Sequence, residues 1–382
     1  MDSRLFWLAL AAFVGAVEGG LIAGQLPLIG AEMGVTIGQA GLLVVGYSLA
    51  YAVGTPLFAV LLGGVGRRRV LAWSEAGLAV CALLLAVAPF FEWMVGARTV
   101  LAVFAGTYTG TAIATAAMIA PAGERGRYMQ VISIGQSLAA LVGVPLGAWI
   151  ATQVSWRVNY GAIAVMAAAA ALALYLRLPR GMPGDTQTVR DRIRVLGNPG
   201  VMPALLSTLL FMAGATPVSI YIGAMMARAG VGIEVLPLVF FAGGLGALAT
   251  GLTAGRIADR IGNRATAIIT SVVVIVTLAV LASLPMAPPG MALPLLLAAF
   301  GVQAYMVWTF SIAVASQLAH LAPSSVPVAI SLNMSGFNIA MAIAAAAGGV
   351  IIDRWGGSVL ALAGIPLVLA ALAIWVMVPE RR

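Results

Sequence analysis

The sequence contains no lysine, one cysteine and one histidine among its 382 residues. A single cysteine excludes an internal disulfide, and these counts leave too little material for a Cys/His metal site. They also argue against a membrane-embedded hydrolase or acyltransferase, which needs a nucleophile and a base or a bound metal. Charged residues make up only 8% of the chain, whereas soluble domains carry about a quarter. The composition therefore points away from a soluble protein and away from an enzyme.

Hydrophobic residues make up 62% of the chain and gather in runs long enough to cross a hydrocarbon core about 30 Å thick. The first run is too long for a signal-peptide core, so we interpret it as a retained helix. The sequence thus predicts an all-α membrane protein with twelve transmembrane helices. The expected spans are 5–28, 39–62, 70–89, 93–119, 127–152, 157–178, 201–226, 235–255, 265–285, 291–319, 327–351 and 357–379.

One polar, basic and Gly/Pro-rich stretch interrupts this pattern near the middle of the chain. It reads "PRGMPGDTQTVRDRIRVLGNPG" and covers residues 179–200. We interpret it as a cytoplasmic linker, with a short amphipathic helix around 189–196, between an N-terminal six-helix bundle (1–178) and a C-terminal six-helix bundle (201–382). Similarities between the halves support this division, since Gly135 and Gly336, and Gly147 and Gly348, match at one constant offset. Paired halves around a central path are typical of secondary transporters.

The net charge of +8 comes entirely from arginine. In a soluble protein this charge balance would suggest nucleic-acid binding. In membrane proteins, however, basic residues concentrate in the cytoplasmic loops. With the N-terminus placed in the cytoplasm, sixteen of the twenty arginines fall inside and three outside. We therefore expect a multi-pass protein of the bacterial inner membrane with both termini cytoplasmic. Its partners are the lipid bilayer and a small-molecule substrate, not nucleic acid. Nothing in the sequence demands an oligomer, so a monomer is expected.

Residues 255–264, "GRIADRIGNR", place four charges in a short stretch after the eighth predicted helix. This stretch resembles the signature loop of the major facilitator superfamily, and the twelve helices, the linker and the repeat extend the resemblance over the whole chain. The resemblance implies that loop charges pair with each other and with a neighbouring helix end across the cytoplasmic gate, biasing one gate state over the other. The gate residues are then Gly255, Asp259, Arg260 and Arg264.

The equivalent place after the second predicted helix carries a degraded copy of this loop. If residues 66–68 align with residues 262–264, Gly63 and Gly64 stand where the later loop has Asp259 and Arg260. The basic end survives in Arg67 and Arg68. We expect the second copy to carry the gate contact, while the first copy can also be explained by the positive-inside rule alone.

The fifth predicted helix, "GQSLAALVGVPLGAW", indicates a branch of the superfamily. Its Gly135, Gly143, Pro145 and Gly147 resemble the helix-5 motif of proton-driven antiporters, where glycines permit close helix contact and proline bends the helix. "SWRVNY" (155–160) and "ARTVLAVFAGTYTG" (97–110) agree with the twelve-helix drug:proton antiporters. The resemblance is greatest to arabinose-efflux-like, sugar-efflux and chloramphenicol-efflux members. Those often have a histidine where this chain has Ala105.

Three ionisable residues within the apolar runs are candidates for proton coupling. Glu18 lies in mid-helix, where a charge costs roughly 2.5–3.5 kcal/mol or more and usually faces a cavity or a partner. The branch carries an acid at this place, so the resemblance implies that Glu18 binds the transported proton, with Arg98 as its partner. A purely structural Glu18–Arg98 pair is the alternative. Glu75 is a second candidate, which could instead reach the interface or pair with an arginine of the preceding loop. No cofactor is expected besides the proton.

The remaining membrane-associated polar groups divide into two sets. Glu32, Glu92, Glu234 and Asp353 lie near predicted outer helix ends, where we expect them to be solvated. Neutral polar and aromatic residues on the helices would line a central substrate cavity, or would form interhelical hydrogen bonds. These are Gln25, Tyr47, Tyr51, Tyr108, Thr109, Gln130, Ser133, Ser137, Tyr221, Gln303, Trp308, Ser335 and Asn338. Such a mixture suits an uncharged or weakly polar organic molecule.

The sequence therefore predicts a proton-coupled exporter of a small organic molecule, such as a drug, sugar or related metabolite, working by alternating access. A proton symporter or a facilitator that imports a metabolite is the alternative, against which the helix-5 motif argues. A sensor built on a transporter fold is a further alternative, which the lack of a soluble signalling domain disfavours.

Overall fold

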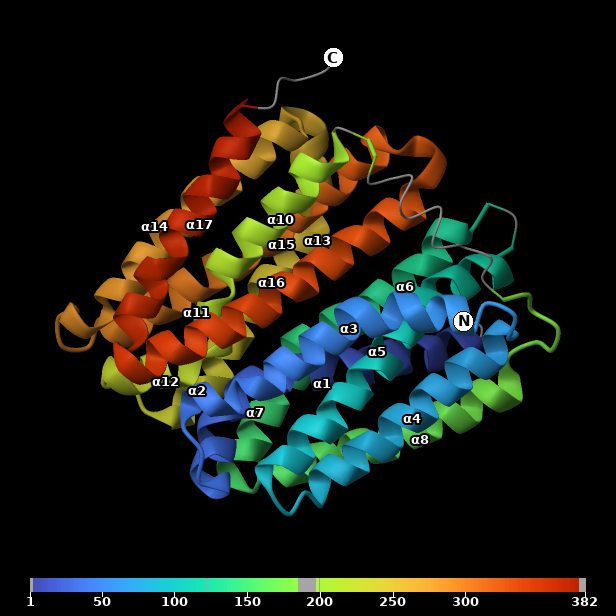
Figure 1. Ribbon diagram of the computed structural model, residues 1–382, viewed down its shortest axis with the longest axis horizontal. Coiled ribbons are helices and arrows are strands. Elements are labelled where there is room, and N and C mark those ends of the chain that lie inside the picture. Colours follow the sequence, from blue (N-terminus) through green and yellow to red (C-terminus); the bar gives the residue numbers. More distant parts are fainter. Residues whose placement is uncertain (1–2, 122, 185–196, 199, 378–382) are drawn as a thin grey trace.

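The computed structural model describes residues 3–121, 123–184, 197–198 and 200–377, which fold into helices and short connections (Figure 1). The helices of the first half are α1 (Ser3–Met33), α2 (Ile37–Ala40), α3 (Leu42–Leu61), α4 (Arg67–Ala86), α5 (Phe91–Ile119), α6 (Arg125–Leu138), the π-helix η1 (Ala139–Gly143), α7 (Val144–Gln153) and α8 (Trp156–Arg177).

The second half has α10 (Val201–Ala215), α11 (Pro217–Ile220), α12 (Ile222–Arg228), the 3₁₀ turn η2 (Ile233–Val235), α13 (Leu236–Ile261), α14 (Asn263–Ser283), the 3₁₀ turn η3 (Leu284–Met286), α15 (Ala292–Leu321), the 3₁₀ turn η4 (Pro323–Ser325), α16 (Val326–Arg354) and α17 (Gly357–Met377). The expected linker helix, 189–196, lies outside the described residues.

Within the described residues, eleven helical segments are long and apolar enough to cross a membrane. The expected seventh span, 201–226, is not one continuous helix, and this corrects the sequence prediction. It is broken into α10, α11 and α12, with the breaks at Thr216 and Tyr221. Pro217 explains the first break, because it has no N–H to donate and its ring clashes with the carbonyl of the preceding turn.

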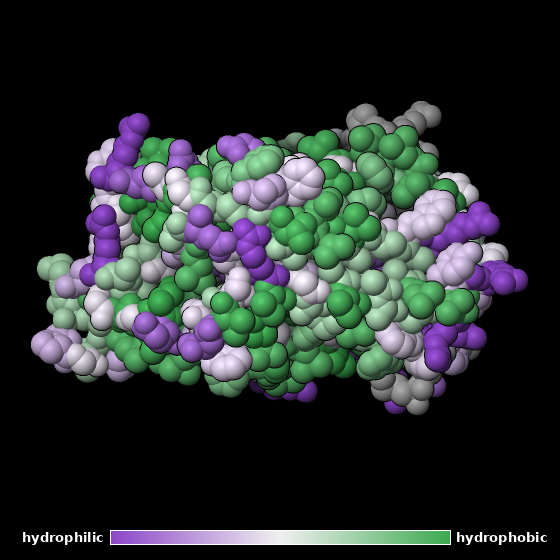
Figure 2. Space-filling model, turned by 90° about the horizontal axis from the view of Figure 1, so that it is seen from below, coloured by the Kyte–Doolittle hydropathy of each residue, from purple (hydrophilic) through white to green (hydrophobic). Residues whose placement is uncertain are grey.

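The surface of the bundle matches a lipid environment. Val53 and Val165, both within long helices, expose 65% and 71% of their surface. The ionisable side chains of Glu18, Glu75 and Arg98 are instead buried inside the bundle. Figure 2 shows a face on which hydrophobic residues cover most of the middle, while hydrophilic residues lie mostly towards the two ends. Hydrophobic residues outside and charges inside or at the ends are what a bilayer requires.

Two short basic segments that the sequence assigned to loops are helical. Arg67 and Arg68 open the first turn of α4, and residues 255–261 continue α13 to its end. The connection from α13 to α14 is the single residue Gly262, whose φ of 86° favours glycine. The charged groups of the signature stretch therefore project from a helix end, because good helix formers extend α13 into solvent until Gly262 stops it.

The fifth span runs from α6 through η1 to α7, with a π-helical turn in place of a regular one. Pro145 lies just after it, at the start of α7. Its ring would crowd the carbonyl one turn earlier, and the wider π-turn relieves this crowding at the cost of a local bend. The bend directs η1 and α7 against α13 of the other half.

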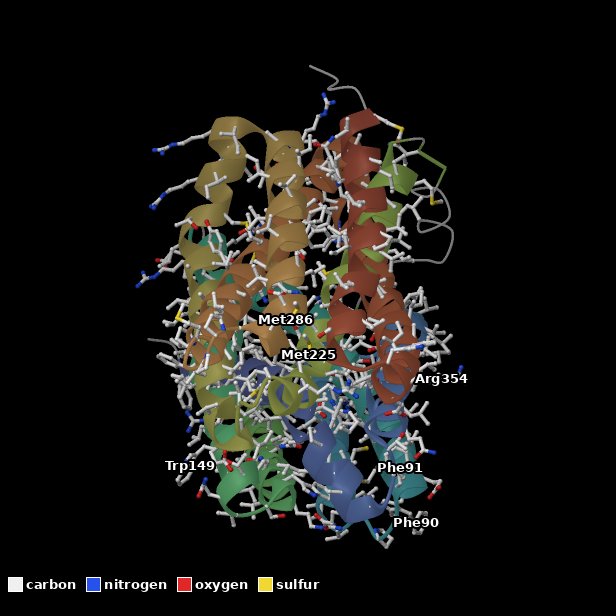
Figure 3. The ribbon with its side chains drawn as sticks, turned by 90° about the vertical axis from the view of Figure 1, so that its left-hand side faces the viewer. Phe90, Phe91, Trp149, Met225, Met286 and Arg354 are labelled. Carbon is white, nitrogen blue, oxygen red and sulfur yellow. The ribbon has the colours of Figure 1, made fainter. Side chains whose placement is uncertain are left out.

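The two halves touch through a limited set of helices. α16 packs on α2 and α3, α13 packs on η1 and α7, and α1 meets α11 and α12. We call the end that holds α2, α11 and α12 the contact end, and the end that holds residues 177–184 the linker end (Figure 1). Figure 3 views the contact end, with Met225 and Arg354 of the second half above and Trp149 and Phe91 of the first half below.

Both ends of the described chain lie at the linker end. Arg177, which ends α8, donates to the Ser3 hydroxyl at the start of α1. Arg264, at the start of α14, donates to the last carbonyls of α17. The start and the end of the described chain therefore lie on the same side of the bundle, which agrees with an even number of crossings when α10, α11 and α12 together are counted as one crossing beside the eleven.

Candidate functional site

The centre of the first half holds a buried ion pair. Arg98 of α5 donates through Nη1 to Glu18 Oε1 of α1 at 2.5 Å. Neither side chain reaches the surface, with exposures of 1% and 0%. A buried charge without a partner would be strongly destabilising, whereas a buried pair is tolerated when its geometry is good. The structure thus brings together the two residues that the sequence placed first.

Two aromatic side chains complete this site. The same Nη1 of Arg98 donates to the hydroxyl of Tyr160 on α8 at 2.9 Å. The guanidinium carbon lies over the ring of Tyr47 on α3, 4.9 Å from its centroid, which is a cation–π contact. We call Glu18, Tyr47, Arg98 and Tyr160 the Arg98 cluster. Its members come from α1, α3, α5 and α8, so it ties four helices of the first half together.

Tyr160 was missed from the sequence, although it lies in the quoted stretch "SWRVNY". One signal was present, because Trp156 and Tyr160 are one turn apart on the same helix face. Their rings meet edge to face at 6.1 Å. The pattern indicates a packed aromatic pair but does not say that an arginine of another helix binds the hydroxyl.

The Arg98 cluster retains unused hydrogen-bonding capacity. Within the described structure, Glu18 Oε2 and Arg98 Nε are buried without a hydrogen-bond partner. If Glu18 took up a proton, Arg98 would keep its bond to Tyr160 and its contact with Tyr47. The positive charge would then remain anchored while the carboxyl became neutral. The cluster can therefore accommodate Glu18 either ionised or protonated. In a simple pair of Glu18 and Arg98, protonation of Glu18 would leave the buried arginine without a partner, at a greater cost in free energy.

Glu75 lies on α4 with an exposure of 0%. Both of its carboxyl oxygens are buried without a hydrogen-bond partner within the described residues. Neither alternative that the sequence offered holds in this conformation, because Glu75 does not reach the interface and does not pair with an arginine of the preceding segment. Arg68 instead lies over the ring of Tyr175, 4.5 Å from its centroid, and Arg67 donates to the carbonyl of Pro183 at 3.1 Å.

The glycines of the helix-5 motif bring the fifth span close to α1. A Cβ atom at Gly143 would collide with Val17, which neighbours Glu18, and one at Gly147 would collide with Leu21. Gly135 packs against the backbone of Ala9 in the same way. The motif therefore determines where α1, and with it Glu18, lies in the bundle.

Pro145 is buried at the start of α7, and Asn159 of α8 donates to the Gly147 carbonyl at 2.8 Å. On its other side the same span meets the second half. A Cβ at Gly244 of α13 would lie 2.5 Å from the Ala140 carbonyl oxygen in η1. The motif helix thus lies between α1 and the opposing half.

The signature residues of the second half make no gate contact in this conformation. Asp259 and Arg260 are exposed and form no hydrogen bond or ion pair within the described chain, and Gly255 is also exposed. Arg264 Nε and Nη2 donate to the Trp375 and Val376 carbonyls at 2.9 and 2.7 Å. A cation at a helix C-terminus is favourable, but α14 and α17 belong to the same half. The expected pairing across the gate is therefore absent from this conformation.

Two acids expected to be solvated have partners at the contact end. Asp353, at the end of α16, accepts from the Thr36 hydroxyl at 2.6 Å and from the Gly38 N–H at 3.0 Å. Glu32 accepts from Trp156 Nε1 at 2.6 Å and from Arg157 Nε at 2.9 Å. The first contact joins the two halves, while the second braces the first half.

The predicted substrate residues do not form one cluster. Six of them donate to backbone carbonyls, four across helices and two, Thr109 and Asn338, within their own helix. The hydroxyl or amide donors and their carbonyl acceptors are Tyr108 to Leu8, Thr109 to Ala105, Tyr221 to Ala345, Gln303 to Ala215, Ser335 to Ala52 and Asn338 to Met334.

The other predicted substrate residues differ in their surroundings. Tyr51 packs against Tyr47 with ring centroids 6.1 Å apart, and Trp308 stacks on Phe337. On α6, Gln130 and Ser133 are exposed and Ser137 is partly buried. Both amide atoms of Gln25 and the Oε1 of Gln303 are buried without a partner in the described structure. These two glutamines therefore keep the polar capacity that a bound molecule could use.

The described residues include no group of three or more His, Cys, Asp or Glu side chains that could hold a metal ion. The site is therefore an arrangement of an acid, an arginine and two tyrosines inside a helical bundle. Its two charged members, Glu18 and Arg98, compensate each other inside the first half.

Comparison with known proteins agrees with this architecture. The chain matches the Major Facilitator Superfamily over residues 8–324 and again over residues 204–382. It is 27% identical to the uncharacterized MFS-type transporter YbcL of Bacillus subtilis (strain 168), covering 92% of this chain and 89% of that protein. It is also 27% identical to the inner membrane transport protein YdhP of Escherichia coli (strain K12), covering 91% and 88%.

A chloramphenicol resistance protein of Streptomyces lividans is 29% identical, with 68% of each chain covered. Among solved structures, the fold resembles that of a point mutant of the nucleoside transporter NupG, with a TM-score of 0.79. That match covers 98% of this chain and 99% of the other at 14% identity, so it shows the fold alone. The chain belongs to the Major Facilitator Superfamily, and the protein is a membrane transporter of small molecules rather than an enzyme.

Proposed function

We propose that this transporter is a proton-coupled antiporter that exports a small organic molecule across the bacterial inner membrane. The single observation that carries the proposal is the Arg98 cluster, in which a fully buried carboxyl meets an arginine at 2.5 Å. Intramembrane ionisable groups are costly, and they usually mark ion pathways or proton relays. The helix-5 motif and the relative that is named a chloramphenicol resistance protein support export over import.

The proposed cycle uses Glu18 as the proton carrier and Arg98 as its fixed counter-charge. When Glu18 is ionised, it pairs with Arg98 and the site is neutral overall. When Glu18 is protonated, Arg98 retains Tyr160 and Tyr47, and the site carries a net positive charge. The two protonation states therefore differ in charge inside a low-dielectric bundle. They favour different conformations of the transporter and different occupancies of its substrate site. A proton entering down its gradient then drives the substrate out by alternating access.

The proposed orientation follows the arginine distribution and places the linker end, with both chain termini, in the cytoplasm. In that orientation the contact end is periplasmic. The contacts of α2 with α16 then belong to a conformation that is closed towards the periplasm. The gate residues of the signature stretch, Asp259 and Arg260, are proposed to pair only after the linker end closes.

The proposed substrate is uncharged or weakly polar. The polar groups left free in the bundle interior include the neutral amides of Gln25 and Gln303. Of the buried ionisable groups Glu18, Arg98 and Glu75, the first two pair with each other, and Glu75 has no partner among the described residues. A neutral organic molecule can meet such groups with few hydrogen bonds and a large apolar contact area.

Everted membrane vesicles test this proposal. A pH gradient is imposed, and a panel that includes chloramphenicol, sugars, nucleosides and amino-acid derivatives is added one compound at a time. We expect at least one compound to dissipate the gradient with the wild-type protein and not with Glu18→Gln. Glu92→Gln is the matched control, because Glu92 is an exposed acid at the start of α5. Transport without proton movement would instead indicate a facilitator, and co-directional movement would indicate a symporter.

A further inference from the structure

Glu75 is the one fully buried acid in the described chain that has no hydrogen-bond or ion-pair partner. Glu18, Glu32, Glu124 and Asp353 all have partners, and the remaining described acids are exposed. Both oxygens of Glu75 lie out of contact with solvent and without a donor. Buried polar groups normally find partners, so an unpartnered carboxyl inside a membrane bundle calls for a functional explanation.

The protonation state of Glu75 in this conformation follows from its surroundings. A carboxylate that loses water and gains neither a cation nor hydrogen-bond donors is far less stable than the neutral acid. The arginines of α4 and α5 do not supply the cation, because Arg98 binds Glu18 and Arg68 lies over Tyr175. Glu75 therefore carries a proton here.

The groups that face Glu75 come from the helices packed on α4, which are α5 and α8. Tyr108 of α5 is the titratable side chain close enough to interact electrostatically with Glu75. Its hydroxyl donates to the Leu8 carbonyl at 2.6 Å. The Tyr108 hydroxyl hydrogen is therefore not available to Glu75, although its oxygen could still accept a hydrogen bond. On α8, Tyr175 faces Arg68, and Arg177 donates to Ser3. None of these contacts neutralises a carboxylate at Glu75.

The depth of Glu75 differs from that of the Arg98 cluster. Tyr108 lies ten residues beyond Arg98 along α5 towards the linker end, which is about 15 Å at the rise of an α-helix. Glu75 lies eight residues into α4 from Arg67, about 12 Å from that same end. The first half therefore contains two buried acids at two depths, and the one nearer the linker end is neutral.

We propose that Glu75 is a second proton-binding site of the transport cycle, which reaches this conformation with its proton bound and releases it towards the linker end while that end is open. This inference rests on the proposed antiport. On emptying, the O–H bond of the Glu75 carboxyl breaks, the proton passes to water, and a carboxylate remains at the base of α4. Each cycle then moves a proton at Glu18 and a proton at Glu75. The basic start of α4, at Arg67 and Arg68, lies on the side to which that carboxylate would be exposed.

The first test uses the proton as its probe. Infrared spectra of the protein in lipid nanodiscs are recorded with isotope-labelled glutamate for the wild type, Glu75→Gln and the control Glu92→Gln. We expect the carbonyl band of a protonated carboxyl without hydrogen bonds at neutral pH in the wild type and the control. The band is absent from Glu75→Gln if it belongs to Glu75. Its absence from the wild type would overturn the inference.

A second arm tests whether Glu75 loses its proton more readily when the linker end is open than when it is closed. In a Cys81→Ala background, a cross-link between Thr36→Cys and Asp353→Cys holds the contact end closed, whereas Asp353→Ala releases it. We expect the band to disappear at lower pH in the cross-linked protein, whose linker end is open, than in the released protein. An identical pH response in both would overturn the inference. This arm needs no Glu75 variant to fold.

A third arm counts protons with the first compound that discharges the pH gradient in the vesicle assay. In proteoliposomes, the number of protons moved per substrate is expected to fall by about half in Glu75→Gln and to stay unchanged in Glu92→Gln. An unchanged ratio in Glu75→Gln would assign Glu75 a structural role. If no compound moves protons with the wild type, the proposed antiport fails, while the infrared arms still decide whether Glu75 binds and releases a proton.

Discussion

The contact between α2 and α16 is expected to set the balance between the two gate states. Asp353 accepts from the Thr36 hydroxyl at 2.6 Å and from the Gly38 N–H at 3.0 Å, and these bonds join the two halves at the contact end. They cannot persist when the halves separate there. We predict that Asp353→Ala shifts the population away from the conformation described here and towards the state that is open at the contact end.

The magnitude follows from the number of bonds and their exposure. A typical intramolecular hydrogen bond contributes about 0.5–1.5 kcal/mol net, and both bonds to Asp353 lie in an exposed setting. Losing both should cost roughly 1–2 kcal/mol, which changes an equilibrium by a factor of roughly 5–30. Thr36→Val removes one of the two bonds, so its effect should be about half as large in free energy. The double variant should resemble Asp353→Ala in this equilibrium, because the bond between Thr36 and Asp353 is already lost, while the cap that Thr36 gives to the Gln39 N–H lies within the first half.

Distance measurements between spin labels provide the assay. Labels on Arg127 of α6 and Arg256 of α13 report the separation of the halves near the linker end, since both residues are exposed. Asp353→Ala should increase the population with the shorter separation. Arg354→Ala is the control, because it alters charge at the same helix end without removing a bond to α2. The reasoning is refuted if Asp353→Ala leaves the distance distribution unchanged or if Arg354→Ala shifts it equally.

Three further predictions concern the site and its support. Tyr160→Phe removes one bond from Arg98 and makes protonation of Glu18 more costly, so the pH profile of transport should shift towards acid by roughly one unit; an unshifted profile would contradict the anchoring role. Gly143→Ala introduces a Cβ that collides with Val17, so it should lower the free energy of unfolding by about 1–3 kcal/mol, measured by thermal unfolding. Val17→Ala should partly restore the stability of this variant; no restoration would contradict the importance of the contact. Arg264→Ala should lower thermal stability modestly without altering the distance distribution above, because its bonds lie within one half; a changed distribution would show that it already contributes to the gate.

The sequence was most informative about features that depend on local composition. Hydropathy predicted where the helices lie, because a bilayer demands long apolar segments regardless of tertiary context. Glu18 and Arg98 could be named because an ionisable residue within an apolar run is costly and conspicuous. Their pairing at 2.5 Å agrees with the expectation that each needs a partner.

Features that depend on tertiary packing could not be predicted in the same way. Tyr160 binds Arg98 through a hydroxyl whose surroundings come from three other helices, and nothing local distinguishes it from a packing tyrosine. Most predicted substrate residues that form hydrogen bonds donate to backbone carbonyls, as Tyr221 does to Ala345, and sequence periodicity does not separate such bonds from cavity positions. Pro217 indicated a disturbance in the seventh span. A proline in the sequence is compatible with a kinked helix and with a helix end, so it did not predict which of the two occurs.

The helix ends were misjudged for a physical reason as well. Arg67 and Arg260 look like loop residues in an apolar chain because they are charged. Both lie within helices that extend past the hydrocarbon region into solvent, where arginine is a good helix former. Charge therefore marks where the membrane ends, whereas Gly262 marks where the helix ends.

The most direct measurement compares two transport modes of one variant in proteoliposomes. Substrate-for-substrate exchange needs no net proton movement, whereas accumulation driven by a pH gradient does. Our account predicts that Glu18→Gln retains exchange and loses accumulation, while Glu92→Gln keeps both. Accumulation by Glu18→Gln at the wild-type level would contradict the account and would leave Glu18 and Arg98 as a structural pair.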